Sequence, residues 1–248
     1  MSKDSEIYEL RVATLLNRIP GVSAKKMGGV EYSDVFIRYK GAQSWLEVKM
    51  NHSDNLINTR MSYEKGKWTA VNEGAGTKEV LGIISSSFEA KQFLIEMGKL
   101  NKPGVAEVTL STTKGAANKD GVISFDDMKD YFAKKPNKYI ATINNVDAAS
   151  IVSKHYTNGK KEPAYYIQIG DDFYRTSEAN PFELGTSDKE VPIFNAKGTL
   201  KVRVSYERNS YYVIVPELKA KIAQPSEYST MPATKKINPF TPITKKKP

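Results

Sequence analysis

The 248-residue sequence has no cysteine and only two histidines, His52 and His155. Without cysteine, the chain has no disulfide, thiol nucleophile, zinc ribbon or iron–sulfur cluster. Two histidines are too few for a histidine-rich zinc site. Any metal chemistry must therefore rely mostly on carboxylate oxygens, which favour a hard cation such as Mg²⁺.

Long hydrophobic runs are absent as well. The most apolar short runs, residues 80–84 and 211–215, are far shorter than the ~20 residues that a membrane-spanning helix needs. The mean hydropathy of −0.49 is that of an ordinary globular protein. No apolar signal-peptide core follows Met1. We therefore expect a cytoplasmic protein that does not enter a membrane.

Positive charge is in excess. The 37 lysines and arginines against 28 aspartates and glutamates give a net charge of +9, which favours a polyanionic partner such as nucleic acid. Residues 225–248 hold five prolines, five lysines and one glutamate. Because this composition disfavours a packed core, we expect a flexible tail that either holds DNA phosphates loosely or is simply solvated.

Hydrophobic spacing predicts the order of elements in the first hundred residues. Ile7, Leu10, Ala13 and Leu16 recur at helical intervals, which predicts a helix over residues 5–19 that stops at Pro20. Three strands and an amphipathic helix are expected next, at residues 22–26, 34–39, 44–50 and 88–100.

The rest of the chain is predicted to be richer in β structure. Polar loops are expected at residues 72–77 and 111–120, a helix at 125–133 and a strand at 138–143. Two hairpins are expected, one joining 165–169 to 173–175 and one joining 200–206 to 211–215. These elements indicate an α/β (α+β) fold, a mixed sheet flanked by helices with a C-terminal β-rich extension.

Two neighbouring strands carry the residues with chemical potential. Glu47 and Lys49 share one face of their predicted strand, because successive side chains point to opposite faces. Asp34 begins the preceding strand, and a short turn between the strands brings it beside Glu47. A carboxylate on the first helix completes the site; Glu9 is the candidate and Glu6 its competitor.

Two carboxylates and an ammonium in one place suit phosphodiester hydrolysis. The carboxylates of Asp34 and Glu47 can hold Mg²⁺, with the backbone carbonyl of Val48 as a further ligand. Lys49 can orient or deprotonate the attacking water, or neutralise charge that develops on the phosphate.

With these residues the sequence resembles the PD-(D/E)XK nuclease superfamily. The match is Asp34, a twelve-residue spacing, and then Glu47-Val48-Lys49, with a Glu-bearing helix ahead and a further helix behind. One position departs from the family pattern, because Ser33 stands where the motif has proline. The resemblance implies a mixed sheet flanked by helices, with Asp, Glu and Lys in the roles just described. We expect a nuclease-like core at 1–104, an accessory β-rich region at 105–224 that either completes the core or shapes the DNA channel, and the basic tail at 225–248.

The acid-x-Lys pattern is not specific by itself. It occurs also at Glu89-Ala90-Lys91, Asp127-Met128-Lys129 and Glu217-Leu218-Lys219. The first two lie on predicted helices, where positions i and i+2 do not share a face. The third follows Pro216 at a strand end, with no Asp-bearing strand just before it. For the Glu47 copy, the alternative is a pair of surface strands with solvated charges.

Other residues suggest contacts with nucleic acid. Lys25, Lys26, His52 and Arg60 are candidates for phosphate binding, although each of them has an ordinary surface role as its alternative. Aromatic residues of the β-rich region either stack on unpaired bases or, as we favour, pack in a sheet core. They are Tyr165, Tyr166, Phe173, Tyr174, Tyr206, Tyr211 and Tyr212.

Two further patterns imitate known ligand sites. Residues 118–127 resemble part of a calcium-binding EF-hand loop, but Ala116 occupies its first ligand position and Asp127 its last, so a turn leading into a helix is favoured. Residues 74–78 lack the spacing of a phosphate-binding loop, and a mobile loop is favoured there.

The sequence therefore predicts a Mg²⁺-dependent DNA nuclease, in which Mn²⁺ can substitute for Mg²⁺. The first alternative is a non-catalytic DNA-binding or assembly protein with a nuclease-like fold. The second is a protein-interaction module whose charges keep it in solution. A homo-oligomer is compatible with each of them, because symmetry leaves no mark on a single sequence.

Overall fold

A computed structural model of the chain describes residues 3–27, 32–71, 74–101, 104–105, 107–111, 121–158, 162–186, 189–207, 211–232 and 235–241. The chain forms two compact units. The first combines residues 1–54, 148–197 and 220–248, and the second combines 55–147 and 198–219. Within the described ranges, every helix is too short or too polar to cross a membrane.

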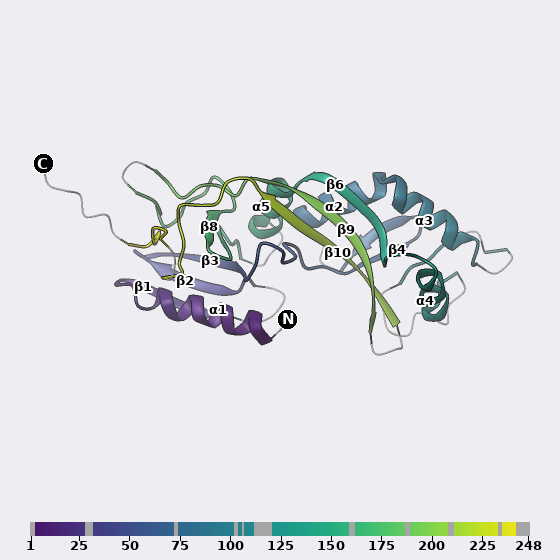
Figure 1. Cartoon of the computed structure of the whole chain (residues 1–248), viewed down its shortest axis with the longest axis horizontal. Helices are drawn as coiled ribbons and strands as arrows, with labels where there is room; N and C mark the ends of the chain where they lie inside the picture. The colour runs from purple at the N-terminus through teal and green to yellow at the C-terminus, as the bar shows by residue number, and fades with distance from the viewer. Residues whose placement is uncertain are drawn as a thin grey trace, which may run out of the picture. The chain divides into compact units, whose positions relative to one another are not determined.

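The first unit is built on a mixed sheet of five strands in the order β1-β2-β3-β7-β8. Its elements are α1 (Lys3–Leu16), β1 (Val22–Lys26), β2 (Val35–Tyr39), β3 (Ala42–Lys49), α5 (Ala148–Asn158), β7 (Tyr166–Ile169) and β8 (Asp172–Arg175). Strands β1, β2 and β3 form an antiparallel meander, β7 joins β3 in parallel, and β8 pairs antiparallel with β7. Helix α1 lies along one face of the meander (Figure 1).

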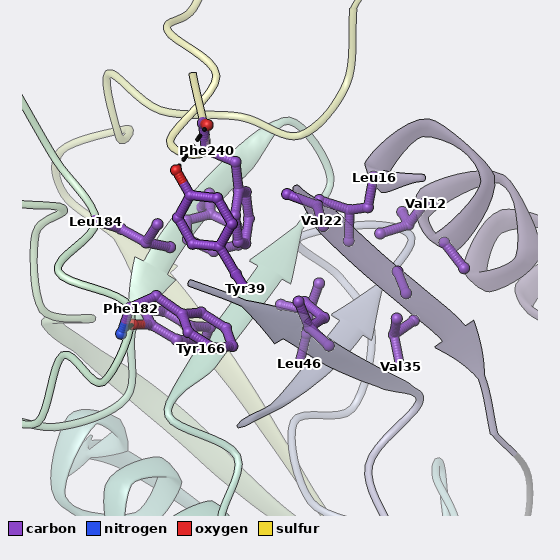
Figure 2. Close-up of a cluster of buried hydrophobic side chains, with 14 of the residues drawn as sticks. Val12, Leu16, Val22, Val35, Tyr39, Leu46, Tyr166, Phe182, Leu184 and Phe240 are labelled. Carbon is purple, nitrogen blue, oxygen red and sulfur yellow. Dashed lines mark hydrogen bonds between the residues drawn. The ribbon is translucent and has the colours of Figure 1, made fainter. Parts of the chain in front are cut away.

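Alternating apolar residues explain how the sheet buries this face. Val12 and Leu16 of α1 are fully buried against Val35 of β2 and Leu46 of β3, in one cluster of hydrophobic side chains (Figure 2). Val35 and Leu46 are direct cross-strand partners, so both point to the helix side. The neighbouring residues on each strand consequently face the other side of the sheet.

The C-terminal segment is part of this core, so the expectation of a flexible tail at 225–248 is wrong for residues 225–232 and 235–241. Tyr228 and Phe240 are almost completely buried in the same hydrophobic cluster, and the hydroxyl of Tyr39 donates to the carbonyl of Phe240 at 3.3 Å (Figure 2). The lysine and proline content suggested a solvated segment. The aromatic residues of the segment outweigh this effect of lysine and proline, because each aromatic side chain buries a large apolar area. Residues 233–234 and 242–248 lie outside the described part of the chain.

The second unit carries the other sheet, with strands in the order β5-β4-β10-β9-β6. Its elements are β4 (Met61–Glu64), β5 (Lys67–Ala70), α2 (Ala75–Ser86), α3 (Phe88–Gly98), α4 (Phe125–Ala133) and β6 (Tyr139–Asp147), together with most of β9 (Ala196–Glu207) and β10 (Tyr211–Ile222). Strand β4 pairs antiparallel with β5 and with β10.

The fold class is confirmed: the protein is a mixed α+β structure in which helices accompany a mixed sheet. The three strands of the meander, helix α4 and the β7–β8 hairpin lie close to their predicted positions. Residues 75–77, expected in a polar loop, instead begin helix α2. Their small side chains carry little helical periodicity, but Gly76 and Thr77 are buried by packing. Of the loop expected at 111–120, residues 112–120 lie outside the described ranges.

The boundaries of the two compact units do not coincide with the expected divisions at residues 104 and 224. The helix predicted at 88–100 is α3 and the strand predicted near 138–143 is β6, and both belong to the second unit. Helix α5 and strand β7 complete the first unit instead, about a hundred residues after β3. A linear division cannot capture this arrangement, because residues 55–147 are inserted between two parts of one sheet-based unit.

Candidate functional site

Asp34 and Glu47 lie side by side on neighbouring strands. Val35, the first residue of β2, is paired with Leu46 of β3, so Asp34 stands opposite Glu47 when the register is continued by one residue. The backbone N–H of Val48 donates to Oδ2 of Asp34 at 2.8 Å. This hydrogen bond holds the Asp34 carboxyl across the gap between the two strands, as the hairpin spacing predicted.

Lys49 is held against Glu47. Its ammonium nitrogen donates to Oε1 of Glu47 at 2.7 Å, and the two side chains are only 17% and 6% exposed. Both point away from the face that carries Leu46 and Val48, because side chains alternate along β3. Two carboxylates and one ammonium therefore meet at one site, as the sequence predicted for Asp34, Glu47 and Lys49.

Tyr156 is a fourth member of the site that the sequence reasoning missed. Its hydroxyl donates to the same Oε1 of Glu47 at 3.0 Å from helix α5, and the side chain is 1% exposed. The hydrogen bond places α5 on the sheet face opposite α1. The signal for this helix was the spacing of Ile151, Val152 and His155 with Tyr156, which repeats at helical intervals.

Burial and like charge shape the electrostatics of the pair of carboxyls. Burial, reinforced by the negative charge of Glu47, raises the pKa of Asp34 to about 8. Burial opposes the charge on Lys49, but the negative charge of Glu47 outweighs it and raises the pKa of Lys49 well above its usual range. Burial also raises the pKa of Tyr156, so its phenol keeps its proton. The site therefore holds an ammonium and a tyrosine hydroxyl as hydrogen-bond donors.

Glu9 is the buried acid of α1, whereas its competitor Glu6 is exposed. Burial raises the pKa of Glu9, and the charges of Glu47 and Lys49 act on it in opposite directions. Glu9 is thus within electrostatic reach of the trio. Its Oε2 lies 3.2 Å from the ammonium of Lys26, which neutralises it.

The lysines predicted to contact nucleic acid lie on opposite faces of β1. Lys26 points to the α1 side and is paired with Glu9, so its charge is already partly neutralised. Lys25 is exposed on the other face, opposite Phe36 in the β1–β2 register. This second face is the one to which Glu47 and Lys49 point.

His52 lies three residues after Lys49 and is held by a buried carboxylate. Its Nε2 is 3.0 Å from Oδ2 of Asp172, while its side chain remains 48% exposed. Lys236 of the C-terminal segment donates to the other oxygen of Asp172 at 2.5 Å. An exposed imidazole with a fixed orientation beside the end of β3 is compatible with the predicted phosphate contact.

Arg60 belongs to the second unit. Its guanidinium lies 3.9 Å from Oε1 of Glu207 in the same unit, and both side chains are well exposed. The arrangement described for the trio contains no contribution from Arg60. Its predicted role in nucleic-acid binding stays a prediction.

The remaining acid-x-Lys copies and the two imitated ligand loops form no comparable arrangement. The first two copies lie on helices α3 and α4, as expected. In the third, Glu217 is engaged by Arg203, whose Nε donates to Oε1 at 2.7 Å. The EF-hand-like stretch is described only from Gly121 onward, and there Ser124 caps helix α4 by accepting from the N–H of Asp127 at 3.1 Å.

Most aromatic residues expected in the β-rich region serve the core. Tyr166 and Phe173 are 0% exposed, and Tyr174 and Tyr212 are 3% exposed. Their rings are inaccessible to a nucleic-acid base. The interpretation of these four residues as core aromatics, favoured from the sequence, is confirmed.

The donor set suits a hard cation. Within the described ranges, no group of three or more histidine, aspartate or glutamate side chains is placed to hold a metal ion. Asp34 and Glu47 supply two carboxylates, and the backbone carbonyl of Val48 a third oxygen. Mg²⁺ in proteins is commonly held by one or two carboxylates while it keeps several waters, so this set fits it. A cation would also offset the burial and the repulsion by Glu47 that together raise the pKa of Asp34.

No protein-family model, curated protein or solved structure matches the chain. Asp34 and Glu47 offer oxygen ligands for a cation, and Lys49 adds a fixed ammonium at the same end of the paired strands.

Proposed function

We propose that this protein is a Mg²⁺-dependent DNA nuclease of the PD-(D/E)XK type, with its active site at Asp34, Glu47 and Lys49. The observation that carries the proposal is the pairing of two carboxylates across β2 and β3 with an ammonium fixed on one of them. Buried charges are costly unless they serve one another or a function. Three ionisable groups kept together at a strand end favour a catalytic role.

The fold around the trio supports the same proposal. The first unit is a mixed sheet with α1 on one face and the Tyr156-bearing helix α5 on the other. This agrees with the core that the resemblance implies. The net charge of +9 suits a DNA substrate.

The residues would divide the work as follows. Asp34, Glu47 and the Val48 carbonyl would hold Mg²⁺, which, when bound, polarises the phosphate and activates a water molecule. Lys49 stays protonated near neutral pH, because its pKa is raised by Glu47. It therefore donates hydrogen bonds to the charge that develops on the phosphate, rather than removing a proton from water. Tyr156 positions Glu47, and Glu9 supports the site as a nearby acid.

The test is cleavage of supercoiled, linear, single-stranded and branched DNA with Mg²⁺, with Mn²⁺ and with EDTA. Wild type should cut at least one substrate only when the metal is present. Lys49→Ala and Glu47→Gln should each slow cutting by at least about 100-fold, the scale of a lost catalytic group. The matched control is Lys219→Ala, which removes an exposed lysine from another acid-x-Lys copy and should leave the rate unchanged.

Three outcomes would contradict the proposal. Cutting that is unaffected by Lys49→Ala and Glu47→Gln would place the active site elsewhere. Salt-sensitive DNA binding without cutting of any substrate would favour the non-catalytic DNA-binding or assembly protein. Neither binding nor cutting would favour the protein-interaction module.

A further inference from the structure

The sheet face that carries the trio also carries an aromatic row. Phe36 of β2 and Trp45 of β3 are direct cross-strand partners. Each lies two residues from a member of the trio, Phe36 from Asp34 and Trp45 from Glu47, so all four side chains point to one face. Two residues along a strand span about 6.6 Å. The aromatic row therefore lies next to the two carboxylates on the same face of the sheet.

Three aromatic rings pack together in this row. Tyr32 stacks on Trp45 with ring centroids 4.9 Å apart and an interplanar angle of 17°. Phe36 lies against the same indole, with centroids 5.2 Å apart. Trp45 is thereby only 7% exposed, whereas Tyr32 and Phe36 remain partly exposed. The buried indole of Trp45 thus supports the two accessible rings of Tyr32 and Phe36.

A cavity of about 420 Å³ opens on these rings. Tyr32, Phe36, Trp45 and Tyr165 line it, together with the polar residues Gln43 and Glu162. Its volume is within the range of about 300–1,000 Å³ typical of small-ligand sites.

The charges in and around the cavity suit different parts of a nucleotide: the base inside the cavity and the phosphate outside it. Among the described residues that line the cavity, Glu162 alone is charged, and it would repel a phosphate. Its carboxylate is an acceptor for the exocyclic amino group of a base such as cytosine. Outside the cavity, Lys25 stands opposite Phe36 and Arg38 lies 5.4 Å above the ring of Phe36. Cations thus flank an aromatic cavity to which, among the described residues, Glu162 adds an acidic side chain.

We propose that this cavity receives an unpaired nucleobase of the nucleotide next to the scissile phosphate. The inference rests on the proposed nuclease function and names its substrate class: single-stranded DNA, or duplex DNA in which a base has left the stack. A phosphate at Asp34 and Glu47 places the adjoining base beside the row of Phe36 and Trp45, one step along the sheet. A base that remains stacked in a duplex cannot enter such a cavity.

The test is an abasic scan of a single-stranded oligonucleotide. Each substrate lacks one base but keeps every phosphate, and its cleavage by wild type at the mapped cut sites is measured with Mg²⁺. Removal of the base next to a cut site should slow cutting there by about 5- to 100-fold, the scale of one lost stacking contact. Removal of bases farther away should have little effect.

Binding provides a readout that does not depend on catalysis. In EDTA, the dissociation constant of wild type should rise with the abasic substrate by a similar factor, measured by fluorescence anisotropy. Tyr32→Ala should weaken binding of the intact oligonucleotide and remove the difference between intact and abasic substrates. The matched control is Tyr63→Ala, because Tyr63 packs against Trp68 in the second unit with centroids 5.2 Å apart.

The outcomes separate this inference from the proposed function. Cutting that is insensitive to every abasic position would overturn the inference and leave the nuclease proposal standing. Equal behaviour of Tyr32→Ala and Tyr63→Ala would overturn it as well. Absence of cutting and of binding on every DNA would overturn both proposals. The scan on wild type needs no variant, so a variant that fails to fold does not weaken the test.

Discussion

At the scale of single residues, the buried carboxyl groups of Asp34 and Glu47 interact unfavourably with each other. Burial and then the nearby charge of Glu47 raise the pKa of Asp34. The ammonium of Lys49 offsets part of this repulsion through its hydrogen bond to Glu47. A metal-free site of this kind costs stability, because desolvated like charges oppose each other. This strain can be measured.

The substitution Asp34→Asn should stabilise the metal-free protein. Folding raises the pKa of Asp34 to about 8, so the native state binds a proton that the unfolded chain has released. Stability of wild type in EDTA should therefore fall as the pH rises from about 4 to about 8. Asparagine keeps an acceptor for the Val48 N–H but carries no charge, so the variant should gain about 0.5–2 kcal/mol at neutral pH. Urea unfolding at a series of pH values measures both effects.

Asp130→Asn serves as the control for this substitution, because Asp130 is exposed on α4. It should leave the pH dependence of unfolding in EDTA as it is in wild type. A pH profile for Asp34→Asn that matches wild type would show that Asp34 does not titrate as the geometry requires.

At the scale of elements, the C-terminal segment changes from an expected tail into part of a core. Phe240 is 0% exposed and lies near the rings of Tyr39, Phe173 and Phe182. Lys236 of the same segment reaches the buried Asp172 carboxylate. The segment therefore closes the side of the sheet on which α1 packs.

Phe240→Ala should destabilise the protein by about 3–5 kcal/mol, the usual cost of deleting a buried phenylalanine. A solvated tail would show almost no change. Thermal or urea unfolding, followed by circular dichroism, distinguishes the two results. Ile237→Ala is the control in the same segment, because Ile237 is 45% exposed, and it should cost well under 1 kcal/mol.

The elements that complete the site come from distant parts of the sequence. Helix α5 supplies Tyr156, and β7 pairs with β3 from residue 166 onward. The local sequence of α5 is that of an ordinary amphipathic helix, and the local sequence of β7 is that of an ordinary apolar strand. Local sequence patterns do not show that α5 and β7 adjoin β3 rather than the elements nearer in sequence, and this is why the compact units do not end at residue 104.

At the scale of the whole molecule, the net charge of +9 predicts how DNA binding depends on salt. Lysines and arginines that neutralise phosphates release counterions, so the affinity falls as the salt concentration rises. In EDTA, the dissociation constant of wild type for single-stranded DNA should rise at least about tenfold between 50 and 200 mM salt. A dissociation constant independent of salt would remove the electrostatic argument for a DNA partner.

The sequence by itself determined the meander and the trio on it. Asp34, Glu47 and Lys49 lie within 16 residues of one another, and strand alternation with a short turn leaves little choice about which side chains meet. The mixed α+β class followed from the same local periodicities.

Only the tertiary structure decided that Tyr156 holds Glu47, that residues 55–147 are inserted into the first unit, and that Phe240 belongs to its core. The tertiary structure also packs Tyr32 against Phe36 and Trp45, and these three aromatic side chains line a cavity. The physical reason is that local patterns specify which face of an element is apolar. The partner that covers that face is selected by packing among all the segments of the chain.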